Sequence, residues 1–149
     1  MNHLSMKSPV GPLTLFADAE TIIALEFGNA PAGPSSPILQ EARKQLEAYF
    51  SGHLRCFNIP LSSNGTPFQQ DVWRLMLEIP YGTSRTYGDL ARGLKSSARA
   101  VGGACGKNPI AIIIPCHRVL AAGGRIGGYS GGTGAETKNA LLRLEGLEI

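Results

Sequence analysis

The first 61 residues combine two kinds of apolar pattern. Residues 10–18 and 21–27 are short apolar runs bounded by turn-forming residues, which predicts two strands joined as a hairpin. Over residues 37–50 the apolar positions recur every three or four residues, which predicts a helix that begins at a proline. Residues 56–61 are a further candidate strand. We therefore expect a small α+β unit at the N-terminus.

The C-terminal pattern is helical and begins with two capping signals. Thr66 is followed three residues later by glutamine, and Thr86 three residues later by aspartate, which predicts a helix start at each. The apolar spacing predicts that the first of these helices ends at Pro80. A short helix to residue 94, a polar turn and a third helix over residues 98–105 complete the order typical of a helix-turn-helix module.

A polar joint at residues 62–65 separates the two patterns. It predicts a domain boundary, with one domain over residues 1–64 and a second over residues 65–149. In the second domain, the glycine-rich residues 121–134 are predicted to form a wing or loop, and residues 136–144 a last helix.

The predicted third helix is built almost entirely from small residues. Residues 98–104 read Ala-Arg-Ala-Val-Gly-Gly-Ala, so Arg99 is the one charged side chain. Each glycine costs a helix about 1 kcal/mol relative to alanine. A helix that reads base edges in the major groove would carry long polar side chains instead. Two explanations stay open: the helix lies in a narrow groove of a partner, or it packs closely against another helix.

The composition is that of an ordinary globular protein with an excess of glycine. The chain has 149 residues, of which 43% are hydrophobic and 17% charged. It contains 19 glycines, and 13 of them lie in residues 82–134. The net charge is only +3, but residues 85–125 hold seven lysines and arginines against one acidic residue. This segment fits either an anionic polymer as partner or a solvated basic face.

The three cysteines, Cys56, Cys105 and Cys116, are far apart in the sequence. An odd number without a Cys-x-x-Cys pair argues against a disulfide framework and against a cysteine-rich zinc site. No secretory signal is recognisable, and the longest apolar run, residues 110–114, is too short to cross a bilayer. We therefore predict a cytoplasmic protein without a membrane partner, in which a thiol stays free to react.

Residues 112–119 combine an apolar run with reactive side chains. Three isoleucines predict a buried strand that stops at Pro115, and Cys116 follows directly. A thiolate is the nucleophilic form of cysteine, and a neighbouring base or cation such as His117 or Arg118 favours it. Neighbours in a strand point to opposite sides, so contact between Cys116 and His117 needs a turn or a bridging water. The alternative is a structural cysteine beside a surface histidine, because the local sequence offers no third group.

The same segment resembles the signature of the O6-alkylguanine-DNA alkyltransferases of the bacterial type. Residues 115–119 read Pro-Cys-His-Arg-Val and follow Asn108-Pro109-Ile110. Residues 99–104 are similar to that family's recognition helix. Further matching motifs, in the family's order, are Phe68-Gln69-x-x-Val72-Trp73, Thr86-Tyr87, Gly128-Tyr129-Ser130-Gly131-Gly132 and Leu141-Leu142-x-x-Glu145-Gly146.

The resemblance implies a two-domain α+β fold and direct repair of alkylated DNA. The N-terminal domain would be a small α/β domain of the ribonuclease H-like type, and the C-terminal domain a helical winged helix-turn-helix. Family members bind duplex DNA in the minor groove and rotate the damaged nucleotide out of the stack. The alkyl group passes irreversibly from guanine O6, or thymine O4, to a cysteine, so each molecule acts once.

The implied partner is double-stranded DNA that contains O6-alkylguanine or O4-alkylthymine. The protein would bind it as a monomer, with cooperative assembly on DNA left open. No cofactor is implied, because thiolate attack on an alkyl carbon needs neither a metal nor a hydride. Some family members bind zinc in the N-terminal domain, but His3, His53 and Cys56 do not reproduce such a ligand set, so we predict no metal.

The resemblance also implies a role for each matching residue. Cys116 would accept the alkyl group, His117 would act as a base through a water, and Glu145 would orient His117. Asn108 would hold the turn around the site by hydrogen bonds.

The remaining implied roles concern the substrate and the duplex. Tyr87 would crowd the phosphate of the target nucleotide and donate to its base, and Ser130 would contact O6. Tyr129 would line the pocket, and the carbonyls of Cys116 and Val119 would receive the guanine amino group. Arg99 would fill the gap in the base stack. The other implied DNA contacts are Thr86, Ala98, Ala100, Gly102, Gly103 and Arg118.

Two alternative functions stand beside this one. A non-catalytic protein that binds alkylated bases would share the fold, but relatives of that kind lack the acceptor cysteine found here as Cys116. A Cys-His-Glu thiol hydrolase would turn over repeatedly. It would leave the small-residue helix and the basic segment unexplained.

Overall fold

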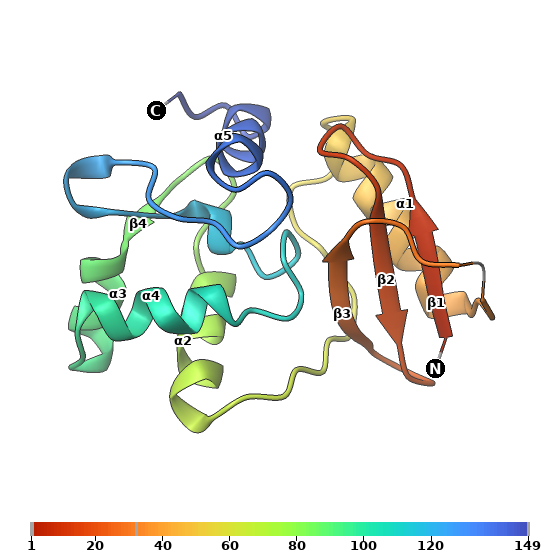
Figure 1. Cartoon of the computed structure of the whole chain (residues 1–149), viewed down its shortest axis with the longest axis horizontal. Helices are drawn as coiled ribbons and strands as arrows, with labels where there is room; N and C mark the ends of the chain where they lie inside the picture. Colours follow the sequence, from red (N-terminus) through yellow and green to blue (C-terminus); the bar gives the residue numbers. More distant parts are fainter. Residues whose placement is uncertain (1, 32, 149) are drawn as a thin grey trace.

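The N-terminal part is an antiparallel sheet covered by one helix. The computed structural model describes residues 2–31 and 33–148. The sheet has the order β1 (Asn2–Met6), β2 (Leu13–Ala17) and β3 (Ile22–Phe27), and α1 (Pro37–Phe50) packs across it (Figure 1). The predicted hairpin and helix are confirmed, but β1 was not predicted because its polar residues hide the strand pattern.

Local signals explain how the hairpin turns. The Asp18 carboxylate accepts hydrogen bonds from the backbone N–H groups of Glu20 and Thr21, at 2.9 and 2.7 Å, which fixes the reversal between β2 and β3. In α1 the proline stands in the first turn as expected, although the Ser36 side chain makes no capping bond.

The strand predicted over residues 56–61 is wrong. These residues are bends and irregular backbone, and they reach the sheet only at the bridge between Ile22 and Leu61. There the Ile22 N–H donates to the Pro60 carbonyl at 2.9 Å, and the Ser62 N–H donates to the Ile22 carbonyl at 3.0 Å. Pro60 has no N–H to donate, so the pairing does not extend from this bridge back into residues 56–60.

The C-terminal part is the helical unit that the capping signals predicted. It contains α2 (Pro67–Leu77), α3 (Tyr87–Leu94), α4 (Ala98–Gly106) and α5 (Ala135–Leu144). Both capping boxes are present, at the starts of α2 and α3, and α4 packs against α2 and α3 (Figure 1). The α3–α4 pair forms the predicted helix-turn-helix.

Trp73 joins two of these helices. Its ring lies in the core, and its Nε1–H donates to the Ala104 carbonyl of α4 at 2.9 Å. A buried indole N–H needs such a partner. Trp73 is therefore a packing residue that fixes α4 against α2.

The predicted strand over residues 112–114 is also wrong. Residues 110–114 form turns and isolated bridges, and Ile112 has φ +74°, a conformation that β-branched residues rarely adopt. The Asn108 side chain stabilises this loop, because its amide donates to the Ile114 carbonyl at 2.8 Å and its Oδ1 accepts from the Ile110 N–H at 3.0 Å. The isoleucines are buried as core residues without forming a strand.

Short elements follow this loop. Residues 116–118 form the 3-10 turn η1 (Cys116–Arg118), and β5 (Val119–Leu120) pairs in parallel with β4 (Arg85–Thr86). A second 3-10 turn, η2 (Ala122–Gly124), opens the glycine-rich loop that leads to α5.

The two parts share one apolar core. They also meet through the backbone, because the Leu25 N–H of β3 donates to the Pro109 carbonyl at 2.9 Å. The boundary between residues 64 and 65 stays a prediction. Within residues 2–31 and 33–148, none of the helices combines the length and apolar character that a bilayer crossing requires.

Candidate functional site

Cys116 lies between two cavities, at the start of η1. One cavity has a volume of about 320 Å³ and the other about 370 Å³, and Cys116, Tyr129 and Ser130 line both. Only 7% of Cys116 is exposed. The first cavity is lined by Tyr87, Gly102, Cys105, Gly106, Cys116, Gly128, Tyr129 and Ser130. The second is lined by Leu25, Glu26, Phe27, Asn108, Ala111, Cys116, Tyr129, Ser130, Gly131 and Gly132.

The surroundings of Cys116 keep its thiol protonated. Burial raises the pKa of the Cys116 thiol, and the neighbouring Asn108 side chain and the Lys138 charge offset only part of that effect. A nucleophilic thiolate therefore needs a base that takes the proton as the reaction begins.

His117 is a buried base whose tautomer is fixed by its partner. Its Nε2 lies 2.7 Å from Glu145 Oε2, and the ring is inaccessible to solvent. An ionised carboxylate only accepts hydrogen bonds, so the proton sits on Nε2 and the lone pair on Nδ1. Among the residues that the structure describes, Nδ1 has no hydrogen-bond partner. Burial lowers the pKa of His117, with the hydrogen bond to Glu145 opposing it, so the ring is neutral at pH 7.

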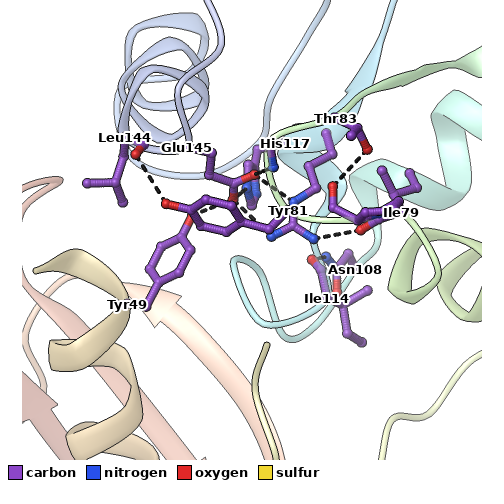
Figure 2. Close-up of polar contacts among 12 residues, drawn as sticks. Tyr49, Ile79, Tyr81, Thr83, Asn108, Ile114, His117, Leu144 and Glu145 are labelled. Atoms are coloured by element: carbon purple, nitrogen blue, oxygen red, sulfur yellow. Dashed lines mark hydrogen bonds and ion pairs between the residues drawn. The ribbon is translucent and has the colours of Figure 1, made fainter. Parts of the chain in front are cut away.

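Glu145, just after α5, holds several donors at once. Arg118 Nε donates to Oε1 at 2.8 Å and Arg118 Nη2 to Oε2 at 3.0 Å, while the Gly82 N–H donates to Oε1 at 3.2 Å. The Tyr49 hydroxyl donates to Oε2 (Figure 2). Burial raises the pKa of Glu145, but the hydrogen bonds from His117 and Arg118 lower it more, to about 2. The carboxylate is therefore ionised at neutral pH.

This geometry contradicts the predicted contact of Arg118 with DNA. Arg118 is 6% exposed, and its guanidinium is bonded to Glu145 and, through Nη1, to the Ile79 carbonyl at 2.8 Å. The DNA contact was implied by the resemblance alone, whereas the η1 turn buries the Arg118 side chain. A buried guanidinium that is held by a carboxylate and a carbonyl does not reach a phosphate at the surface.

Of the predicted substrate contacts, Tyr87, Tyr129 and Ser130 line the first cavity, whereas Val119 is fully buried and lines neither cavity. Tyr87 and Tyr129 are half-buried on the wall of the first cavity, and Ser130 is exposed at its rim. The Tyr129 hydroxyl is buried and has no hydrogen-bond partner among the described residues. The structure thus brings these side chains together around Cys116, although they come from distant parts of the sequence.

Lys138 is a site residue that sequence reasoning missed. It is fully buried in α5, and its Nζ donates to the carbonyls of Val119 at 2.6 Å and Gly128 at 3.1 Å. Its Nζ also lies 3.5 Å from the Tyr87 hydroxyl. Burial lowers the pKa of Lys138, while Cys116 raises it. The sequence offered one sign that Lys138 is buried: it lies one turn before Leu141, on the buried face of the helix.

The surface of α4 answers one of the questions that the sequence left open. Ala98, Arg99, Ala100 and Gly103 are exposed, and Gly102 is half-buried at the cavity. A Cβ atom added at Gly102 or Gly103 would meet nothing within 4 Å. Packing against another helix therefore does not require these glycines; Val101 and Ala104 do the packing instead.

The remaining candidates are a metal site and the other two cysteines. Among the described residues there is no group of three or more His, Cys, Asp or Glu side chains able to hold a metal ion. Cys56 is an exposed free thiol and Cys105 a buried one, with burial raising the pKa of Cys105 to about 12.

Comparison with known families gives two adjoining matches. Residues 1–63 match the family described as 6-O-methylguanine DNA methyltransferase, ribonuclease-like domain. Residues 67–147 match the 6-O-methylguanine DNA methyltransferase, DNA binding domain. A methylated-DNA–protein-cysteine methyltransferase of Methanosarcina acetivorans is 42% identical to the chain, over 98% of this chain and 99% of the relative.

Solved structures agree with these matches. OGT of Mycobacterium tuberculosis in complex with DNA superimposes with a TM-score of 0.87 at 44% identity, covering 96% of this chain and 91% of that one. S. pombe Atl1 in complex with damaged DNA containing O6-carboxymethylguanine gives a TM-score of 0.51 at 33% identity, covering 58% of this chain and 82% of that one. The ribonuclease-like and DNA-binding domains confirm the predicted fold class.

Proposed function

Because this chain belongs to the 6-O-methylguanine DNA methyltransferase family, we propose that it transfers an alkyl group from guanine O6 in duplex DNA to Cys116. A carbon–sulfur bond forms at Sγ, and the bond between O6 and the alkyl carbon breaks. The electron pair stays on guanine, which takes up a proton. Thymine O4 is the second substrate position of the same chemistry.

The observation that carries this proposal is the buried His117 ring, which follows Cys116 in η1 and is held by Glu145. Its Nε2–H is committed to Glu145, so only Nδ1 is left to accept the thiol proton, through a water. The buried thiol does not ionise by itself, because burial raises its pKa. Cys116, His117 and Glu145 thus take the roles of nucleophile, base and orienting group.

The substrate base enters the first cavity after leaving the duplex. An O6 atom inside the stack cannot reach a thiol that is 7% exposed, so the nucleotide must rotate out, at a cost of a few kcal/mol. Arg99 on the open face of α4 fills the gap, and the glycines beside it let the helix approach the minor groove closely. Tyr87, Tyr129 and Ser130 hold the rotated base, and Thr86, Ala98 and Ala100 contact the backbone.

Transfer to Cys116 is a single-turnover reaction. Removing the alkyl group would require a nucleophile to break the carbon–sulfur bond and expel the Cys116 thiolate, and the proposed chemistry provides no such step. Each molecule, acting as a monomer in the cytoplasm, would repair one lesion without a cofactor.

Intact-mass spectrometry with peptide mapping tests the proposal. The protein is incubated with a duplex that contains one O6-methylguanine. We expect one methyl group per molecule, located on Cys116 and absent in Cys116→Ser. Cys56→Ser is the matched control, because Cys56 is exposed and lies outside both cavities. It should be methylated like the unchanged protein.

The same experiment separates the alternatives. A non-catalytic function would consist of binding alone, and S. pombe Atl1, which this chain resembles, was solved in complex with damaged DNA containing O6-carboxymethylguanine. Tight binding of the damaged duplex without an adduct on Cys116 would establish that function and refute ours. Release of the methyl group over many cycles would indicate a thiol hydrolase.

A further inference from the structure

Tyr49 connects the N-terminal sheet-and-helix unit with the carboxylate of the site. Its hydroxyl donates to Glu145 Oε2 at 2.6 Å, although the two residues are 96 positions apart. Tyr49 is fully buried near the end of α1, and its ring packs edge-on against Tyr81 with centroids 6.1 Å apart. Figure 2 shows the ring reaching from α1 toward Glu145.

The contact falls on the oxygen that holds the base. Oε2 of Glu145 also lies 2.7 Å from His117 Nε2 and accepts from Arg118 Nη2, while Oε1 accepts from Arg118 and the Gly82 N–H. A carboxylate offers about four lone-pair positions, so these donors saturate it and fix its orientation. Of the described residues that donate to Glu145, Tyr49 alone comes from the N-terminal unit.

We propose that Tyr49 is a positioning residue for the transfer reaction, which fixes the Glu145 oxygen that holds His117 and reduces the basicity of that oxygen. The inference rests on the proposed transfer to Cys116. A hydrogen bond to a carboxylate stabilises its charge, so the carboxylate stabilises a protonated imidazole less. Tyr49 thereby keeps His117 neutral, with Nδ1 able to accept a proton.

The charged groups around His117 each raise or lower its pKa. The charged groups that face it are Glu145 and Lys138, from the α5 region, and Arg118 in η1. Burial lowers the pKa of His117, and the Arg118 and Lys138 charges lower it further. Glu145 raises the pKa of His117, and the hydrogen bond from Tyr49 weakens this effect of Glu145. From α2 and the segment after it, His117 receives no further charge among the groups that shift its pKa.

The pH dependence of methyl transfer tests the role of Tyr49. Single-turnover rates are measured with excess protein on a duplex containing O6-methylguanine, from pH 5 to pH 8.5. The rate should fall on acidification as His117 becomes protonated. In Tyr49→Phe the midpoint of this acid limb should move upward by about half a pH unit, because Glu145 regains basicity. The rate on the plateau should fall several-fold.

Tyr81→Phe is the matched control. Tyr81 belongs to the same aromatic cluster, but its hydroxyl donates to the Leu144 carbonyl at 3.3 Å and not to Glu145. Its acid limb should coincide with that of the unchanged protein. An unmoved limb in Tyr49→Phe, or an equal shift in both variants, would overturn the inference. If the unchanged protein adds no methyl to Cys116, the proposed function itself fails.

A second substitution keeps the test decisive if Tyr49→Phe does not fold. Replacing Tyr49 with 3-fluorotyrosine retains the ring and the hydroxyl but makes the hydroxyl a stronger donor. The acid limb should then move to lower pH, opposite to the shift in Tyr49→Phe. A purely structural role for Tyr49 predicts no shift, because lost stability changes the active fraction and leaves the midpoint unchanged.

Discussion

Two adjacent glycines of α4, Gly102 and Gly103, and two of the loop before α5, Gly131 and Gly132, have opposite environments. Gly102 and Gly103 face open space, where an added Cβ would meet nothing within 4 Å. In the loop, a Cβ at Gly131 would overlap the Phe27 ring, and one at Gly132 would overlap Thr137. The fold itself requires Gly131 and Gly132, and it leaves Gly102 and Gly103 unexplained.

The difference distinguishes internal from external reasons for a small residue. A glycine that the protein's own atoms crowd is explained by packing or by a positive φ. A glycine that weakens a helix and faces solvent needs an explanation outside the chain. For α4 the proposed explanation is the DNA minor groove, which the helix approaches with its backbone.

The largest effect is expected at Gly132. Its φ is +52°, and the added methyl group of Gly132→Ala would overlap Thr137. Backbone strain of about 1–2 kcal/mol and overpacking of about 1–3 kcal/mol should together lower the free energy of unfolding. Urea denaturation measures this loss. Gly124→Ala is the control, because Gly124 also has a positive φ but its Cβ would meet nothing. Equal losses of unfolding free energy in both variants would show that the overlap with Thr137 does not contribute.

The next effect concerns Arg99 on the open face of α4. Arg99→Ala should lower the rate of repair of duplex DNA by about 10- to 100-fold, because base flipping costs a few kcal/mol that the inserted side chain offsets. Reaction with free O6-methylguanine should be almost unchanged. Lys107→Ala, at the other end of the same helix, removes a charge without a stacking role and should lose less. Equal losses on both substrates would contradict the role of Arg99 in the stack.

Features that depend on nearby residues could be predicted from the sequence, whereas an apolar run did not reveal its backbone conformation. The starts of α2 and α3 were predictable because a capping box is local: Thr66 and Thr86 each bond a residue three positions away. The loop at residues 110–114 was mistaken for a strand, because apolar residues signal burial in either conformation. Only the Asn108 side chain distinguishes them, and its partners lie within six residues.

In the candidate site, contacts between residues far apart in the sequence could not be predicted. Cys116 and His117 are adjacent, but their adjacency alone left a structural cysteine as the alternative, and only the family resemblance assigned them roles as a pair. Lys138 resembles an exposed helical lysine until its carbonyl partners, Val119 and Gly128, are known. Tyr49 resembles one more apolar position of α1, because its partner Glu145 is brought to it only by the packing of the two parts. Long-range polar contacts leave no local periodicity from which they could be predicted.

The smallest effect, and the most direct test of the comparison, is at Gly103. Gly103→Ala should raise the free energy of unfolding by about 0.5–1 kcal/mol, because alanine is the better helix former and its methyl group has space. Urea denaturation should show this gain, while repair of methylated duplex falls a few-fold and reaction with free O6-methylguanine stays the same. The protein would then be more stable and a poorer repair protein, as expected if its partner, and not its fold, requires the glycine. A gain in stability with unchanged duplex repair would mean that α4 does not approach DNA at Gly103.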